Sequence, residues 1–102
     1  MLAELKKNSP EEARENRISL GLWLGALREE RGLSQRALAD ILSLDYYTFI
    51  SQLETGRGKI PEQRYAEWAE ALGQDPKSFV KVLMSYYHPT TYSLLFDEED
   101  RG

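Results

Sequence analysis

Hydrophobic residues recur every three or four positions along most of this chain, which is the spacing of amphipathic α-helices. No segment alternates apolar and polar residues for long enough to predict a β-strand. Prolines and glycines divide the pattern into five segments joined by short links. We therefore expect an all-α protein, a five-helix bundle, whose helices start or stop near Pro10, Gly32, Gly56, Pro61, Gly73 and Pro76.

The first helix has a strong start signal in the sequence SPEEA. Ser9 can cap the helix and Glu12 can complete a capping box, with a proline at the first helical position. The apolar stripe of this helix consists of three leucines, Leu20, Leu24 and Leu27. Gly21 and Gly25 lie in the same segment, and each weakens a helix by about 1 kcal/mol relative to alanine. A break or kink is therefore predicted between residues 16 and 20.

The later helices carry start signals of the same kinds. Ser34 and Asp45 are predicted to cap the second and third helices, and prolines lie at the starts of the fourth and fifth. The residues expected to face the core are Leu38, Ala39, Leu42, Ile50, Leu53, Tyr65, Trp68, Ala69, Leu72, Phe79, Val80, Leu83 and Tyr87. Pro89 disfavours helical geometry at His88, so the fifth helix should end there, before a short apolar piece, TYSLLF.

Composition narrows the class of protein. A chain of 102 residues with 41% hydrophobic and 29% charged residues is typical of one globular domain. The absence of cysteine and the single histidine leave no thiolate zinc site and no cysteine nucleophile, and no serine lies in a nucleophile-elbow motif. We expect no enzymatic activity, no metal and no cofactor. No apolar run is long enough for a signal peptide or a membrane span, so we expect a cytoplasmic protein with no membrane partner.

The net charge of −4 initially argues against a nucleic-acid partner. The charge is uneven, however, because the tail after Phe96 carries four acids and one base. The stretch 28–64 contains six bases and six acids, so it is neutral as a whole. Phosphate would be attracted only if those bases gather on one side of the fold.

The segment 42–58, LSLDYYTFISQLETGRG, combines an apolar helix face with an unusual outer face. Ile50 and Leu53 face one way, whereas the residues on the other faces are Tyr47, Thr48, Ser51 and Gln52. Hydroxyls, amides and tyrosines suit base edges and phosphates, whereas a merely solvated helix would more often carry lysine and glutamate. Two short helices joined by a tight turn, the second with a polar outer face, form a helix-turn-helix.

The sequence ALREERGLSQRALADIL, followed by FISQLETGRGKIP and YAEWAEALG, resembles the Cro/CI-type (XRE-like) helix-turn-helix family of DNA-binding transcriptional regulators. The resemblance covers residues 20–73 and implies a lambda-repressor-like DNA-binding domain. It further implies a small transcriptional regulator that binds double-stranded DNA sequence-specifically. We expect such a protein to act as a homodimer on a two-fold symmetric site.

The resemblance also implies roles for individual residues. Those implied to read bases in the major groove are Tyr47, Thr48, Ser51 and Gln52. Those implied to contact the DNA backbone are Gln35, Arg36, Tyr46, Arg57 and Lys59. Arg28 and Glu54 occupy positions at which family members often form a partly buried ion pair. Such a pair would tie the first helix to the third.

Two departures from the family pattern fall in the helix-turn-helix. One extra residue lies between the second helix and Ile50, and Ser43 stands where a turn glycine is usual. The insertion lengthens either the turn or the first turn of the third helix. The register of Asp45, Tyr46 and Tyr47 therefore stays open, and both tyrosines have an alternative interpretation as half-buried helix residues.

These predictions divide the chain into four parts. They are an N-terminal helical arm (1–17), the helix-turn-helix domain (18–73), a C-terminal helical extension for dimerisation (74–96) and an acidic tail (97–102). Leu22 and Trp23 face away from the leucine stripe, so they pack either on Leu2 and Leu5 or on another chain. The rival hypothesis is a protein-interaction module, such as an antitoxin whose main partner is a toxin or another regulator. Its partner surface would be the acidic tail or the Leu22/Trp23 face.

Overall fold

The computed structural model describes residues 9–97, and this part of the chain contains helices and no β-strand. Six α-helices follow one another: α2 (Pro10–Glu30), α3 (Gln35–Ile41), α4 (Thr48–Glu54), α5 (Tyr65–Ala71), α6 (Pro76–Tyr87) and α7 (Pro89–Tyr92). A 3-10 turn, η1 (Glu62–Arg64), precedes α5, and a π-helical turn, η2 (Ser93–Asp97), follows α7. The all-α prediction is confirmed, with one α-helix more than the five expected.

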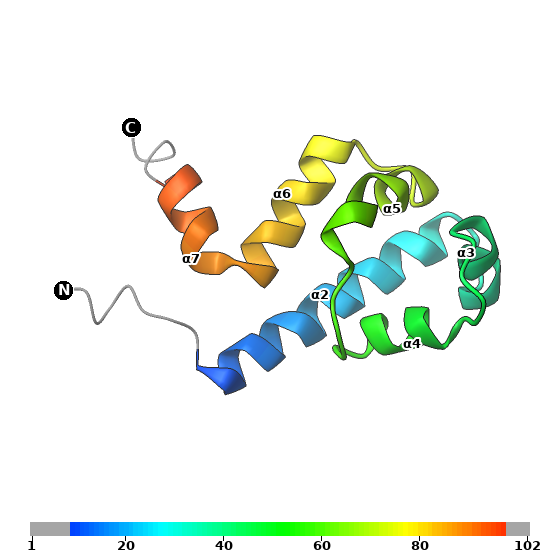
Figure 1. Ribbon diagram of the computed structural model, residues 1–102, viewed down its shortest axis with the longest axis horizontal. Coiled ribbons are helices and arrows are strands. Elements are labelled where there is room, and N and C mark those ends of the chain that lie inside the picture. Colours follow the sequence, from blue (N-terminus) through cyan, green and yellow to red (C-terminus); the bar gives the residue numbers. More distant parts are fainter. Residues whose placement is uncertain (1–8, 98–102) are drawn as a thin grey trace.

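The core forms around α2, which runs through the middle of the molecule (Figure 1). The helix packs against α4 on one side and against α6 on another. The largest fully buried side chains are Trp68, Phe79, Leu20, Leu38, Ile50, Leu72 and Leu83. Each was expected to face the core, whereas Tyr65 and Val80 are only half-buried. Burying one such side chain is worth about 1.5–3 kcal/mol, so this cluster is the main source of stability.

No break interrupts α2, so the break or kink predicted between residues 16 and 20 is wrong. The glycines that motivated it have another use. A Cβ on Gly21 would lie 2.5 Å from the backbone oxygen of Leu53, and one on Gly25 would lie 3.2 Å from the Glu54 carboxylate. Both glycines therefore allow α4 to approach α2 closely, and the packing compensates for their low helix propensity.

Most of the predicted helix starts are confirmed. Ser9 forms a complete capping box with Glu12, and Ser34 accepts a hydrogen bond from the Ala37 N–H at 3.0 Å. Two starts differ from the prediction. The fourth helix was expected to start at Pro61, but the 3-10 turn η1 follows Pro61 and α5 begins only at Tyr65. The third helix begins at Thr48, with Tyr47 at the capping position and no side-chain cap. The prediction that Asp45 caps this helix is therefore wrong.

The C-terminal extension begins with α6, which belongs to the core. Asp75 caps α6 by accepting from the Ser78 N–H at 3.0 Å, and the helix ends at Tyr87, before His88, as predicted. Pro89 then takes the first position of α7, where its missing N–H is no loss. Within residues 9–97, no helix is long and apolar enough to cross a membrane.

Leu22 and Trp23 have different environments. The Trp23 ring stacks on Phe79 of α6, with centroids 5.6 Å apart and planes at 25°. Leu22 is 68% exposed. The two predicted N-terminal partners, Leu2 and Leu5, and residues 98–102 of the acidic tail lie outside the described residues.

Candidate nucleic-acid interface

The turn between α3 and α4 spans residues 42–47 and contains an unusual serine. Ser43 has a φ of 59°, in the left-handed region that a turn glycine would occupy without strain. The N–H groups of Ser43 and Leu44 donate to the carbonyls of Asp40 and Ala39 at 3.1 and 2.8 Å, which closes the end of α3. Because α4 starts only at Thr48, the extra residue lengthens this turn and not the helix.

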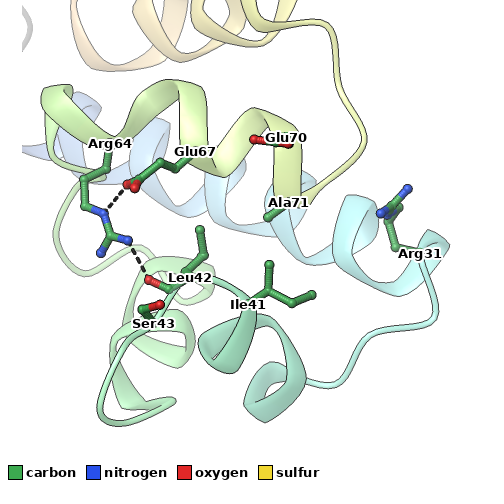
Figure 2. A pocket seen from close by; sticks show the side chains of 8 residues that line it. All are labelled: Arg31, Ile41, Leu42, Ser43, Arg64, Glu67, Glu70 and Ala71. Atoms are coloured by element: carbon green, nitrogen blue, oxygen red, sulfur yellow. Dashed lines mark hydrogen bonds and ion pairs between the residues drawn. The ribbon is translucent and has the colours of Figure 1, made fainter.

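Arg64 holds the same turn from the side of α5 (Figure 2). Its Nη2 donates to the Leu42 carbonyl at 2.6 Å, and its Nε donates to Glu67 at 2.5 Å. These contacts form one end of an open cleft of about 540 Å³, which Ile41 and Ala71 also line. Hydrogen bonds to α3 carbonyls therefore hold the turn on one side, and a side chain of η1, directly before α5, holds it on the other.

Arg28 and Glu54 join α2 to the end of α4. The Nε and Nη2 atoms of Arg28 donate to the two carboxylate oxygens of Glu54 at 2.7 and 3.0 Å, which is a bidentate pair. Arg28 Nη1 also donates to the Leu33 carbonyl at 2.8 Å. The hydrogen bond to Glu54, partly opposed by burial, raises the pKa of Arg28 above its ordinary value.

Gln35, implied to contact the DNA backbone, also belongs to this cluster. Its amide nitrogen donates to Glu54 Oε1 at 3.0 Å, and its side chain is half-buried at the first position of α3. One contact therefore fixes the start of α3 against the end of α4. An amide nitrogen carries two N–H groups, so this contact uses only one of them.

The outer face of α4 presents polar side chains to solvent. Thr48 and Gln52 are exposed, and Ser51 is half-buried. The inner face is apolar, because Ile50 and Leu53 are buried and the Phe49 ring meets Trp68 edge-on at a centroid distance of 6.3 Å. The helix therefore buries one side in the core and leaves hydroxyl and amide groups on the other.

Tyr46 and Tyr47 precede α4 and lie on the surface. Tyr46 is 75% exposed and Tyr47 is 41% exposed, so neither is a core residue. The guanidinium of Arg36, on the first turn of α3, lies 5.1 Å from the Tyr47 ring centroid in a cation–π contact. This contact brings two residues of the implied DNA-binding set together across the turn.

The loop that follows α4 carries the remaining two implied backbone contacts. Arg57 and Lys59 are exposed, and they alternate with Gly56 and Gly58, both of which have a φ of 90°. The Arg57 N–H donates to the Gln52 carbonyl at 2.8 Å, so the loop folds back on the end of α4. Two cations are thus placed directly after the polar-faced helix.

The described part of the chain contains no cluster of side chains suited to bind a metal ion. Across residues 9–97, no three histidine, aspartate or glutamate side chains converge in a way that would hold a metal ion. His88 is exposed at the end of α6.

A comparison with protein families gives the class of this domain. Residues 19–78, more than half of the chain, match the family model described as a helix-turn-helix domain. The chain belongs to this family, which is of the XRE/Cro-like type and indicates DNA binding. A search of curated proteins finds no match.

Sequence reasoning missed the side chains that hold the turn and the loop in place. Arg64 was counted only as a charge, Tyr87 only as a core residue, and Arg17 was not considered. Each acts on a backbone carbonyl or N–H of a distant segment, at Leu42, Ile60 and Gly56 respectively. Such contacts follow from how the helices cross, which no local sequence pattern reports.

Proposed function

We propose that this protein is a small transcriptional regulator that binds double-stranded DNA sequence-specifically, as a homodimer on a two-fold symmetric site. The observation that carries the proposal is the outer face of α4, a short helix whose apolar side is buried and whose Thr48 and Gln52 are exposed. The family match, to a helix-turn-helix domain, supports the same conclusion.

The proposed base-reading residues are those of α4 and of the position before it, Tyr47, Thr48, Ser51 and Gln52. Gln52 is the strongest candidate, since an amide can bond an adenine edge at two points and the side chain is exposed. Ser51 is half-buried, so it would contact only a base edge that comes close to the helix. Asp45 lies in the turn before α4, so we do not assign it a base contact.

The proposed backbone contacts are Gln35, Arg36, Tyr46, Arg57 and Lys59. Three of these are cations, on the first turn of α3 and in the loop after α4. Phosphate contacts position a protein on the duplex and supply salt-dependent affinity without reading sequence. The net charge of −4 therefore does not oppose DNA binding, provided that these cations face the duplex.

A homodimer is supported by apolar surface on the C-terminal extension. Leu94 and Leu95 are 68% and 53% exposed. A groove of about 500 Å³ between α6 and η2 is lined by Pro76, Val80, Met84 and Phe96, together with Lys77 and Lys81. A second copy that covers this surface would place two recognition helices on successive turns of DNA.

Binding titrations with single variants test the proposed function. Gln52→Ala should weaken binding to the preferred site by about 1–3 kcal/mol and relax the preference at one base position. Arg57→Ala should weaken binding to preferred and scrambled DNA alike and lower the salt slope by about one. The matched controls are Gln74→Ala, at the link before α6, and Arg31→Ala, at the end of α2, and both should bind as the wild type does.

The same titrations separate the rival function. If Gln52→Ala and Arg57→Ala both leave DNA affinity unchanged, α4 does not read DNA. A protein-interaction module of the antitoxin kind then becomes the better explanation.

A further inference from the structure

The loop that carries Arg57 and Lys59 is fastened at both ends by residues from outside the helix-turn-helix. We call residues 55–60 the grip loop. Its first half contacts the N-terminal half of α2, and its last residue contacts the end of α6. The two proposed phosphate-binding cations lie between these fixed points.

The first fastening is at Gly56. Arg17 Nε donates to the Gly56 carbonyl at 3.3 Å, and Gly56 is buried against Ile18. A Cβ at Gly56 would lie 2.6 Å from Ile18 Cγ1, and the φ of 90° also requires glycine. The start of the grip loop therefore lies directly on the backbone of α2.

The second fastening is at Ile60. The Tyr87 hydroxyl accepts a hydrogen bond from the Ile60 N–H at 3.1 Å, in a buried position. Lys59 Nζ lies 5.3 Å from the centroid of the same ring, in a cation–π contact. One side chain of α6 thus holds both the backbone of the loop and one of its two cations.

We propose that Tyr87 is a positioning residue for the phosphate contacts of Arg57 and Lys59. The inference rests on the proposed function. It adds that a residue of α6 helps to position the side chains that contact the DNA backbone. A loop that is already ordered loses less entropy when its cations meet phosphates. Phosphates carry no sequence information, so loss of this preorganisation should weaken binding to every DNA sequence equally.

Tyr87 gives a cleaner test than Arg17. The guanidinium of Arg17 is itself a cation next to the grip loop, so its removal would also remove a charge that attracts phosphate. Tyr87→Phe removes only the hydroxyl, and the ring stays in the core and beneath Lys59. Tyr86→Phe is the matched control, since it is the same substitution at the neighbouring, half-buried position.

The experiment is a set of titrations of the full chain on the preferred site and on scrambled DNA over a salt series. Tyr87→Phe should bind both DNAs about three- to tenfold more weakly, which is the range expected for one hydrogen bond. The ratio of the two affinities should stay the same, and the salt slope should become shallower. Exchange of the Ile60 amide hydrogen should accelerate while core amides of α2 remain protected. Tyr86→Phe should match the wild type in every measurement.

Three results would overturn the proposal. Wild-type affinity of Tyr87→Phe, or a loss of affinity confined to the preferred site, would show that Tyr87 does not position the phosphate contacts. A Tyr87→Phe protein that no longer folds would show that the hydroxyl serves the whole fold. Gly58→Ala is a second probe of the loop, because the φ of 90° disfavours alanine while no atom lies within 4 Å of the new Cβ. It should also weaken both DNAs equally, and unchanged affinity would count against a role for loop geometry.

The proposed function and this inference fail in different ways. If Arg57→Ala weakens DNA binding and Tyr87→Phe does not, only the positioning role is wrong. If the wild-type chain binds neither DNA, the proposed function itself is wrong.

Discussion

Arg28 of α2 and Glu54 of α4 form a bidentate ion pair, with nitrogen–oxygen distances of 2.7 and 3.0 Å. The side chains are only 11% and 12% exposed, so solvent screens the pair much less than it would a surface pair. Gln35 adds a third hydrogen bond to the same carboxylate at 3.0 Å. The pair therefore connects three elements, α2, α3 and α4, at the base of the helix-turn-helix.

Removal of Arg28 should destabilise the fold. Arg28→Met keeps the apolar stem but leaves Glu54 largely buried with only Gln35 as a partner, so we expect a loss of about 3 kcal/mol. Glu54→Gln and the double variant complete a double-mutant cycle, measured by denaturant unfolding. A coupling energy above about 1 kcal/mol would support the pair. Arg31→Met, at an exposed position, is the control, and additive effects in the cycle would contradict the prediction.

Some features of the fold could be predicted from the sequence, and others could not. The helix faces and most caps were predicted correctly because they depend on residues close together in the chain, as in the box between Ser9 and Glu12. The meaning of Gly21 was missed, since its close contact is with a helix some thirty residues away in sequence, near Leu53. The Asp45 prediction failed for a related reason. The long turn separates Asp45 from the start of α4, and turn length depends on how α3 and α4 pack.

The candidate interface shows the same division. Gln52 and Arg57 were chosen from residue type and family position, and the structure places Gln52 on the exposed face of α4 and Arg57 in the loop after it. The contact between Tyr87 and Ile60 joins residues 27 positions apart, so no local pattern indicated it. The residues proposed to contact DNA could be predicted from the sequence, whereas the residues that hold them in place could not.

Gly21→Ala should destabilise the protein although alanine is the better helix former. The new Cβ would lie 2.5 Å from the Leu53 carbonyl oxygen and 2.6 Å from that of Glu54, and backbone cannot move aside cheaply. Overpacking costs about 1–3 kcal/mol, and a clash with backbone atoms should lie in the upper part of that range. The gain in helix propensity is about 1 kcal/mol, so we expect a net loss of about 1–2 kcal/mol. Gly25→Ala meets only the flexible Glu54 side chain at 3.2 Å, so its effect should be smaller. Thermal melts decide the order, and a higher melting temperature for Gly21→Ala would contradict it.

Ser43→Gly should stabilise the protein. Ser43 has a φ of 59°, and the left-handed conformation costs about 1–2 kcal/mol for a residue with a Cβ. Glycine removes that cost but adds about 0.5–1 kcal/mol of unfolded-state entropy, so the net gain should be about 0.5–1 kcal/mol. Ser43→Val should be destabilising, because a β-branched residue tolerates this conformation poorly. Equal stability of the glycine and valine variants in urea would show that the turn relaxes out of this conformation.

Tyr87 should make the fold sensitive to alkaline pH. Burial raises the pKa of Tyr87 to about 12, although the hydrogen bond from Ile60 acts in the opposite direction. The pKa in the folded state lies above the ordinary value, so the folded state favours the neutral phenol. The contribution of this neutral side chain to the free energy of unfolding is complete below about pH 10 and is lost as the pH rises toward 12. A shift of this size corresponds to about 2–3 kcal/mol. Unfolding free energies from pH 8 to 12 should fall more steeply for the wild type than for Tyr87→Phe. Parallel curves would show that ionisation of Tyr87 does not cause the loss of stability.

The proposed homodimer is best tested by changing its exposed leucines. The whole extension cannot be deleted, because Phe79 and Leu83 of α6 are part of the core. Leu94→Glu combined with Leu95→Glu alters residues that are 68% and 53% exposed, so folding should be unaffected. Introduced charges would repel across a two-fold axis and would be costly to bury, so we expect a monomer by sedimentation. Leu22→Glu is the matched control, with a leucine also 68% exposed, and it should remain dimeric.

Footprinting should show two protected half-sites about one DNA turn (~34 Å) apart for the wild type and one weakly protected half-site for the double variant. If the double variant stays dimeric, the dimer interface lies at another surface. If the wild type is monomeric at tens of micromolar, the prediction of a homodimer is wrong.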